Sequence, residues 1–173
     1  MLEDQDARPH RLLRHVDPRR RATHITDMID NRTFADAARE LEEDFALLDD
    51  WRDKVELIID LGKELPALPE ALKTEASKVR GCQSQVWLVA EPIADGRLHL
   101  RADSDAVLVK GLISLLLRLY DRRTPREILD NPPEVLERIG LSRLLTPGRA
   151  NGLQAMVARI RGIAQALAEA RAG

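Results

Sequence analysis

Residues 85–102 read QVWLVAEPIADGRLHLRA, and their apolar side chains alternate with a period of two in two successive runs. The runs are separated by Asp95 and Gly96, a pair that is typical of the turn in an antiparallel hairpin. We therefore predict two antiparallel strands, and we expect residues 79–81 to add a short third strand. This arrangement would leave Cys82 at the bend between the third strand and the hairpin.

Helical periodicity precedes the hairpin. Apolar residues recur at steps of three and four from Thr33 onward. They are Phe34, Ala38, Leu41, Phe45 and Leu48, followed after the expected N-cap Asp50 by Trp51, Val55, Ile58 and Ile59. We interpret them as core positions of a helical hairpin or of one bent helix, which ends before Pro66 and Pro69.

Further helices are predicted after the hairpin. Residues 106–120 are too short and too interrupted by charge to span a bilayer, and we expect them to form a central core helix capped by Asp103 or Ser104. Two Thr-Pro pairs, at 124–125 and 146–147, are typical of helix starts. The whole order predicts an α+β domain over residues 33–173, with a three-stranded antiparallel sheet packed with helices.

Composition narrows the function classes. The chain has 173 residues, 44% of them hydrophobic, and a net charge of -2, so nothing global points to nucleic acid or to a membrane surface. A single cysteine without an apolar leader favours the cytoplasm. Residues 1–32 are rich in arginine without apolar periodicity, and we predict a disordered basic N-terminal arm, with Met28 as an alternative start.

Cys82 is the one cysteine, so it forms no intrachain disulfide and cannot alone provide a structural zinc cage. Centring the hairpin near Ala94 would pair Val89 with His99 and bring Cys82 beside residues 105–107, at the start of the central helix. His99 would then lie about 20 Å from the thiol, which argues against a Cys/His dyad.

The reactivity of the thiol stays open on this evidence. A helix N-terminus and Arg80 would lower the pKa of Cys82, whereas Asp103 and Asp105 would raise it. A buried, inert cysteine is the common case, but the flanking Gly81 and the polar residues at 83–85 suit a loop or a docking surface.

The run GCQSQVW, residues 81–87, resembles the signature of the SufE family of sulfur-acceptor proteins. Three other blocks resemble the same family: residues 61–66, residues 103–112, and residues 145–156 at the start of the last helix. The resemblance extends from Phe34 to Leu167.

The resemblance implies a fold shared with IscU-type scaffolds and a role as a sulfur carrier. Such a protein takes the terminal sulfur of a persulfide from a pyridoxal-phosphate cysteine desulfurase, SufS-like, stimulates that enzyme, and passes sulfur to an iron-sulfur scaffold, SufB-like. It is a transfer partner rather than an enzyme, needs no cofactor or metal, and is expected to be a monomer or a weak homodimer. A single cysteine suits a carrier better than a cluster scaffold.

The resemblance also implies roles for particular residues. Cys82 matches the persulfide acceptor. Gln83 and Ser84 would place the loop, while Asp105 and Arg149, each expected in the first turn of a helix, would hold the loop or meet the desulfurase. Helix capping and surface charge are the other reading of Asp105 and Arg149.

Two alternatives remain from the residues themselves. One is a single-cysteine thiol peroxidase or thiol transferase in which Cys82 cycles through a sulfenic acid. The other is an interaction module with an inert cysteine.

Overall fold

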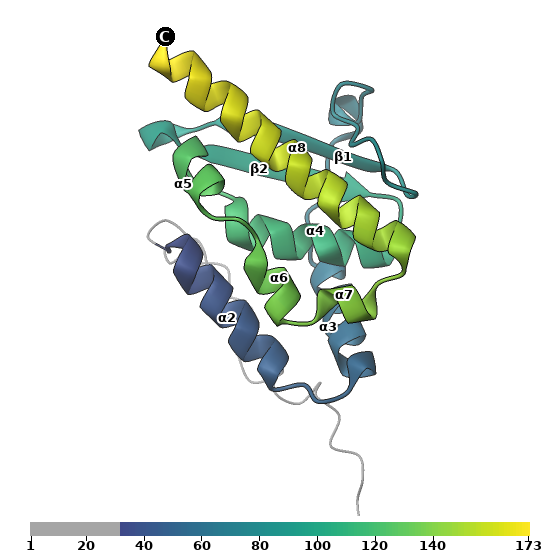
Figure 1. The fold of residues 1–173 in the computed structure, drawn as a ribbon. Helices are drawn as coiled ribbons and strands as arrows, with labels where there is room; N and C mark the ends of the chain where they lie inside the picture. Colours follow the sequence, from purple (N-terminus) through teal and green to yellow (C-terminus); the bar gives the residue numbers. More distant parts are fainter. Residues whose placement is uncertain (1–31) are drawn as a thin grey trace, which may run out of the picture. The chain divides into compact units, whose positions relative to one another are not determined.

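The structure is a computed structural model that describes residues 32–173 (Figure 1). The predicted basic arm and the alternative start at Met28 therefore lie, apart from Arg32, outside the described residues.

The predicted hairpin is present, as strands β1 (Val86–Pro92) and β2 (Leu98–Ser104). Its register differs from the prediction by two residues, because Val89 pairs with Arg101 rather than with His99. The turn is centred on Asp95, whose φ of 62° is followed by a φ of 72° at Gly96. Both residues adopt the left-handed conformation that a tight turn requires, which moves the centre one position beyond Ala94.

The predicted third strand is wrong, because the described residues form a two-stranded sheet. The segment before Cys82 contributes one isolated bridge, between Lys78 and Trp87, supported by a 2.8 Å hydrogen bond from the Val79 amide to the Val86 carbonyl. Gly81 then takes a φ of 91° and turns the chain back toward β1 before a longer ladder can form.

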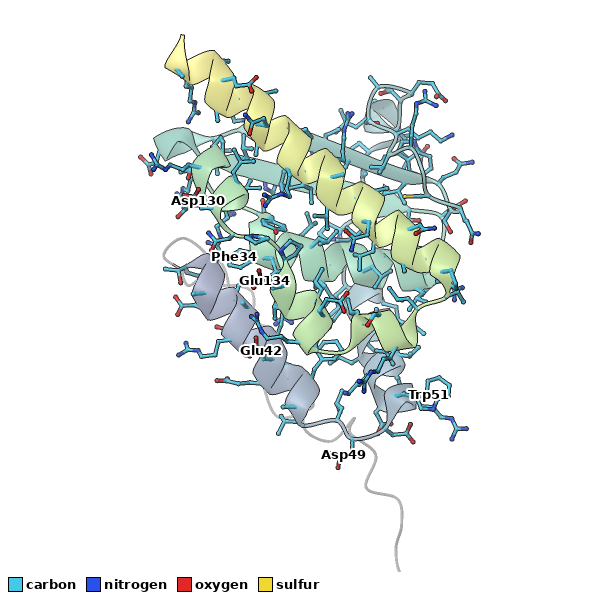
Figure 2. The ribbon with its side chains drawn as sticks, viewed as in Figure 1. Phe34, Glu42, Asp49, Trp51, Asp130 and Glu134 are labelled. Atoms are coloured by element: carbon cyan, nitrogen blue, oxygen red, sulfur yellow. The ribbon has the colours of Figure 1, made fainter. Side chains whose placement is uncertain are left out.

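Two separate helices precede the sheet, α2 (Phe34–Ala46) and α3 (Trp51–Lys63). Thr33 and Asp36 form a capping box at the start of α2, and the Asp50 carboxylate accepts the Arg52 amide at 2.9 Å, as expected of an N-cap. Trp51 does not belong to the core. It is 59% exposed and projects from the start of α3 (Figure 2), so its apolar spacing was misleading.

Helix α4 (Val107–Tyr120) is the central element and packs against α2, α3, β2 and α8. It crosses α3 at two glycines, Gly62 and Gly111, where a Cβ on either residue would run into the backbone of the other helix. Its N-cap is Ala106, not the predicted Asp103 or Ser104, although the Ala106 amide donates to the Ser104 hydroxyl at 3.2 Å.

Short helices and one long helix complete the chain. They are α5 (Pro125–Asp130), α6 (Glu134–Arg138), α7 (Leu141–Leu144) and α8 (Pro147–Ala172). Thr124 and Thr146 cap α5 and α8, as the two Thr-Pro pairs predict. No helix in residues 32–173 is both long and apolar enough to cross a membrane.

Helix α8 lies across the hairpin in Figure 1, and it contacts the loop before β1 and the turn between the strands. Near its start the Gly152 carbonyl lies 3.5 Å from the Cys82 sulfur, and near its end Arg171 donates to the carbonyl of Gly96 in the hairpin turn at 3.1 Å. The α+β architecture is therefore confirmed, and α8 is the helix against which the cysteine loop lies.

Candidate functional site

Cys82 lies on a bend between the bridge at Lys78 and strand β1, and its side chain is half-buried. The positive φ of Gly81, 91°, creates the bend immediately before the cysteine. A residue with a side chain would be strained in this conformation whatever the available space, which explains why the motif has a glycine at position 81.

The C-terminal foot of the loop is held by Gln85. The Gln85 amide donates to Asp105 Oδ1 at 3.0 Å, and the Gln85 carbonyl accepts from the Ser104 hydroxyl at 2.7 Å and from the Asp105 amide at 3.4 Å. Asp105 precedes the first residue of α4 by two positions, so the expectation that it lies in the first turn of a helix is wrong. Its carboxylate fixes the loop rather than capping α4.

The other side of the loop rests on the start of α8. The Cys82 thiol donates to the Gly152 carbonyl at 3.5 Å, and the Gln83 side-chain amide lies where a Cβ on Gly148 would be. Gly81 faces Ala155 one turn further along, since a Cβ on Gly81 would lie 3.4 Å from that of Ala155. We call these three α8 positions, Gly148, Gly152 and Ala155, the α8 seat.

The segment that meets residues 105–107 most directly is Gln85, three residues beyond Cys82, whose backbone groups are bonded to Asp105. The thiol itself is hydrogen-bonded to α8, at the Gly152 carbonyl, which the sequence did not predict.

Burial favours the protonated form of the Cys82 thiol and raises its pKa above the ordinary value. Arg80, which was expected to oppose this effect, forms an ion pair with Glu75 at 3.6 Å. The group of α8 next to the sulfur is the Gly152 carbonyl oxygen, which accepts a hydrogen bond from the S–H group and does not stabilise a thiolate.

His99 lies far from the thiol along the sheet. It pairs with Glu91 near the end of β1 that is remote from Cys82, and its Nδ1 lies 3.0 Å from Asp121 Oδ1. His99 therefore forms no dyad with Cys82, as the sequence indicated.

The remaining predicted site residues lie around the loop. Gln83 is exposed and covers Gly148, whereas Ser84 is half-buried between Gln83 and the foot at Gln85. Arg149 is in the first turn of α8, as expected, next to Gly148, and is exposed. The structure thus brings Cys82, Gln83 and Arg149 to the start of α8 and ties Asp105 to the same loop through Gln85.

The burial of Asp103, which the sequence suggested as a helix cap, was not predicted. Asp103 is 3% exposed and accepts the amides of Leu68 at 3.1 Å and Ser104 at 2.8 Å, with Lys73 and Lys110 as ion-pair partners at 3.4 and 3.6 Å. Burial opposes its ionisation, but the two amides and the two ammonium groups together lower the pKa of Asp103. Its position in the last part of the predicted second strand could have indicated burial. The same residues are also typical of a helix N-cap, so the sequence did not separate the two interpretations.

The α8 seat was also missed. Gly148 and Gly152 are spaced four apart and share one face of a helix, but such spacing is common, and nothing in it indicates which distant segment lies against it.

Comparison with known proteins agrees with this geometry. The fold is similar to the solution structure of a hypothetical protein from Thermus thermophilus, with a TM-score of 0.63 and 22% identity over 77% of this chain and 96% of the other. Residues 39–164 match the family model described as SufE, an Fe-S metabolism associated domain. That match covers most of the chain and includes Cys82 and its loop, so the chain belongs to the SufE family and is associated with Fe-S metabolism.

Proposed function

We propose that this protein is a sulfur carrier that accepts a persulfide sulfur on Cys82 from a pyridoxal-phosphate cysteine desulfurase. The Cys82 thiolate attacks the terminal sulfur of the donor persulfide, a new S–S bond forms at Cys82, and the donor S–S bond breaks. The donor cysteine leaves as a thiolate and takes up the proton that Cys82 lost. No oxidant or metal enters this exchange.

The observation that carries the proposal is the mounting of Cys82. The thiol lies on a bend whose foot is fixed by Gln85 and which rests on α8, so the thiol is half-sheltered at the surface without a histidine partner in residues 32–173. Sulfur exchange with an activated persulfide needs access and a thiolate but no local base. A hydrolase would need the base that this site lacks.

The raised pKa of Cys82 gives the desulfurase a role beyond delivering sulfur. The free carrier keeps its thiol protonated and slow to react, which protects it from oxidants. Docking that moves the loop into the desulfurase would expose the thiol next to the donor persulfide. In this proposal Gln83, Ser84, Asp105 and Arg149 hold the loop or contact the desulfurase. Gln83 and Ser84 belong to the loop, Asp105 holds its foot through Gln85, and Arg149 is exposed at the start of α8, next to the Gly148 that Gln83 covers.

The final acceptor in this proposal is an iron-sulfur scaffold, SufB-like, since one cysteine does not supply the several ligands of a cluster. The proposal places the carrier in the cytoplasm as a monomer or a weak homodimer, and as a stimulating partner of the desulfurase rather than an enzyme.

Intact mass after incubation with a cysteine desulfurase and cysteine tests the proposal. We expect a gain of one sulfur that reductant removes, located at Cys82, and faster cysteine turnover by the desulfurase. The Cys82→Ser variant should show neither effect. If Cys82→Ser stimulates the desulfurase as well as the original chain does, the carrier mechanism is wrong.

A thiol peroxidase is less compatible with this site, because it would have to form its thiolate in the free protein, where burial raises the pKa of Cys82. In the carrier proposal the thiolate forms only after docking to the desulfurase. Peroxide consumption without any desulfurase, at a rate that Cys82→Ser abolishes, would contradict this assessment.

A further inference from the structure

The contact between Cys82 and the α8 seat depends on the protonation of the sulfur. The thiol is the donor and the Gly152 carbonyl is the acceptor, with 3.5 Å between the sulfur and the oxygen. A carbonyl oxygen carries partial negative charge, so it attracts the S–H group and repels an anionic sulfur.

The two ends of the loop differ in this respect. At the foot, Gln85 is bound through its own backbone groups to Ser104 and Asp105, and none of these hydrogen bonds involves the sulfur. The foot therefore holds in any state of Cys82. Only the contact with the α8 seat can report what the cysteine carries.

We infer that the α8 seat distinguishes the empty carrier from the loaded one: the loop rests on α8 while Cys82 is a thiol and leaves Gly152 once Cys82 holds a persulfide. The inference deepens the proposed function and rests on it. Loading replaces Cys82 S–H by Cys82 S–S–H, and a persulfide is a stronger acid than the parent thiol. The loaded group is thus an anion near neutral pH, without the proton that Gly152 binds.

The geometry allows the loop to move as a hinged unit. Gly81, at a φ of 91°, is the flexible point on one side, and the Gln85 foot is the fixed point on the other. Against α8 the loop is held by the thiol hydrogen bond, by the Gln83 side chain over Gly148, and by the approach of Gly81 to Ala155. Among these contacts, the thiol hydrogen bond is the one that changes when Cys82 is loaded.

The consequence is a difference in shape between the two forms of the carrier. The donor meets an empty protein with a seated loop, and the acceptor meets a loaded protein with a free one. A downstream partner that binds the free loop would select loaded carriers over empty ones.

Backbone ¹⁵N relaxation of the full chain tests the inference without a desulfurase. Cys82 is loaded with inorganic polysulfide, whose S–S bond the thiolate attacks, and the order parameters of the loop amides at 80–84 are compared between the thiol and persulfide forms. We expect lower order parameters in the loaded form, because loss of one hydrogen bond raises the population of the open loop about three- to tenfold. Amides of α4 should be unchanged.

A variant pair of equal size provides a second measurement without sulfur chemistry. Cys82→Asn places a neutral donor beside Gly152, and Cys82→Asp places an anion there. We expect high order parameters of the loop amides in the first variant and low ones in the second. Equal order parameters in both variants, or in the thiol and persulfide forms, would overturn the inference.

The two proposals fail separately. If polysulfide loading frees the loop but the desulfurase never loads Cys82, the sulfur-carrier function is wrong and the loop response stands. If the desulfurase loads Cys82 and the order parameters of the loop do not change, the carrier function stands and the role of the α8 seat is wrong.

Discussion

Replacing Asp105 by alanine should make Cys82 react faster by loosening the foot of its loop. The Asp105 carboxylate accepts the Gln85 amide at 3.0 Å, while the hydrogen bond from the Ser104 hydroxyl to the Gln85 carbonyl, 2.7 Å, survives the substitution. One of the hydrogen bonds at the foot is lost, and water can replace the acceptor because the Gln85–Asp105 bond lies at the exposed surface. We expect a cost to the closed loop of about 1 kcal/mol.

A cost of that size raises the population of the open loop about fivefold. Alkylation by iodoacetamide at fixed pH reports this population directly, because Cys82 is the only cysteine in the chain. The free energy of unfolding, measured in parallel by denaturant titration, should fall by no more than about 1 kcal/mol.

Asp105→Asn is the matched control. This variant removes the negative charge of residue 105, and the removal by itself favours the Cys82 thiolate. It keeps an oxygen that can accept a hydrogen bond from the Gln85 amide. The alanine variant should therefore react clearly faster than the asparagine variant. Equal rates for the two variants would refute the reasoning, since any acceleration would then come from charge alone and the hydrogen bond would not hold the loop.

Three further outcomes are expected. Gly111→Ala should lower the free energy of unfolding by about 3 kcal/mol, because its Cβ would overlap the Ile58 backbone, whereas Gly162→Ala, with nothing within 4 Å, should raise it by up to about 1 kcal/mol in the same titration. Because the pKa of Asp103 is lowered in the folded state, its carboxylate stabilises the protein at pH values above the ordinary aspartate pKa of about 4, and this stability is lost as the pH falls through the folded-state pKa. In Asp103→Asn the free energy of unfolding should therefore depend less on pH in the acid range. Burial raises the pKa of Tyr120 to about 12, so the free energy of unfolding should fall as the pH rises from about 10 to 12. The Tyr120→Phe variant should not show this contribution to the fall.

The regular elements could be predicted because their signals are local. Alternation of apolar residues indicates the hairpin, and Thr33, Asp50, Thr124 and Thr146 mark helix starts through side-chain bonds that span two or three residues. Such bonds form or fail within one turn, so no distant segment can change their meaning.

Register and edges were less predictable because they depend on the conformation of single residues. Placing the turn centre at Asp95 instead of Ala94 shifts every pair of the hairpin by two positions. A shift of two keeps each side chain on its face of the sheet, so the apolar pattern could not reveal the error. The third strand failed for a related reason, since the positive φ of Gly81 ends the pairing after one bridge.

In the candidate site, residues with reactive or polar side chains could be predicted from the sequence, and the glycines that face them could not. Cys82 and Asp105 carry chemical groups, so a motif can identify them, and the structure shows what each group touches. Gly148 and Gly152 contribute by lacking a side chain, and that property has meaning only once the opposing residue is known. The opposing residues, Gln83 and Cys82, are far from them in sequence, and the missing Cβ of Gly148 is what lets the loop lie on α8. A family motif that identifies the reactive sulfur therefore says little about what restrains it, and the restraint decides when the thiol is available to a partner.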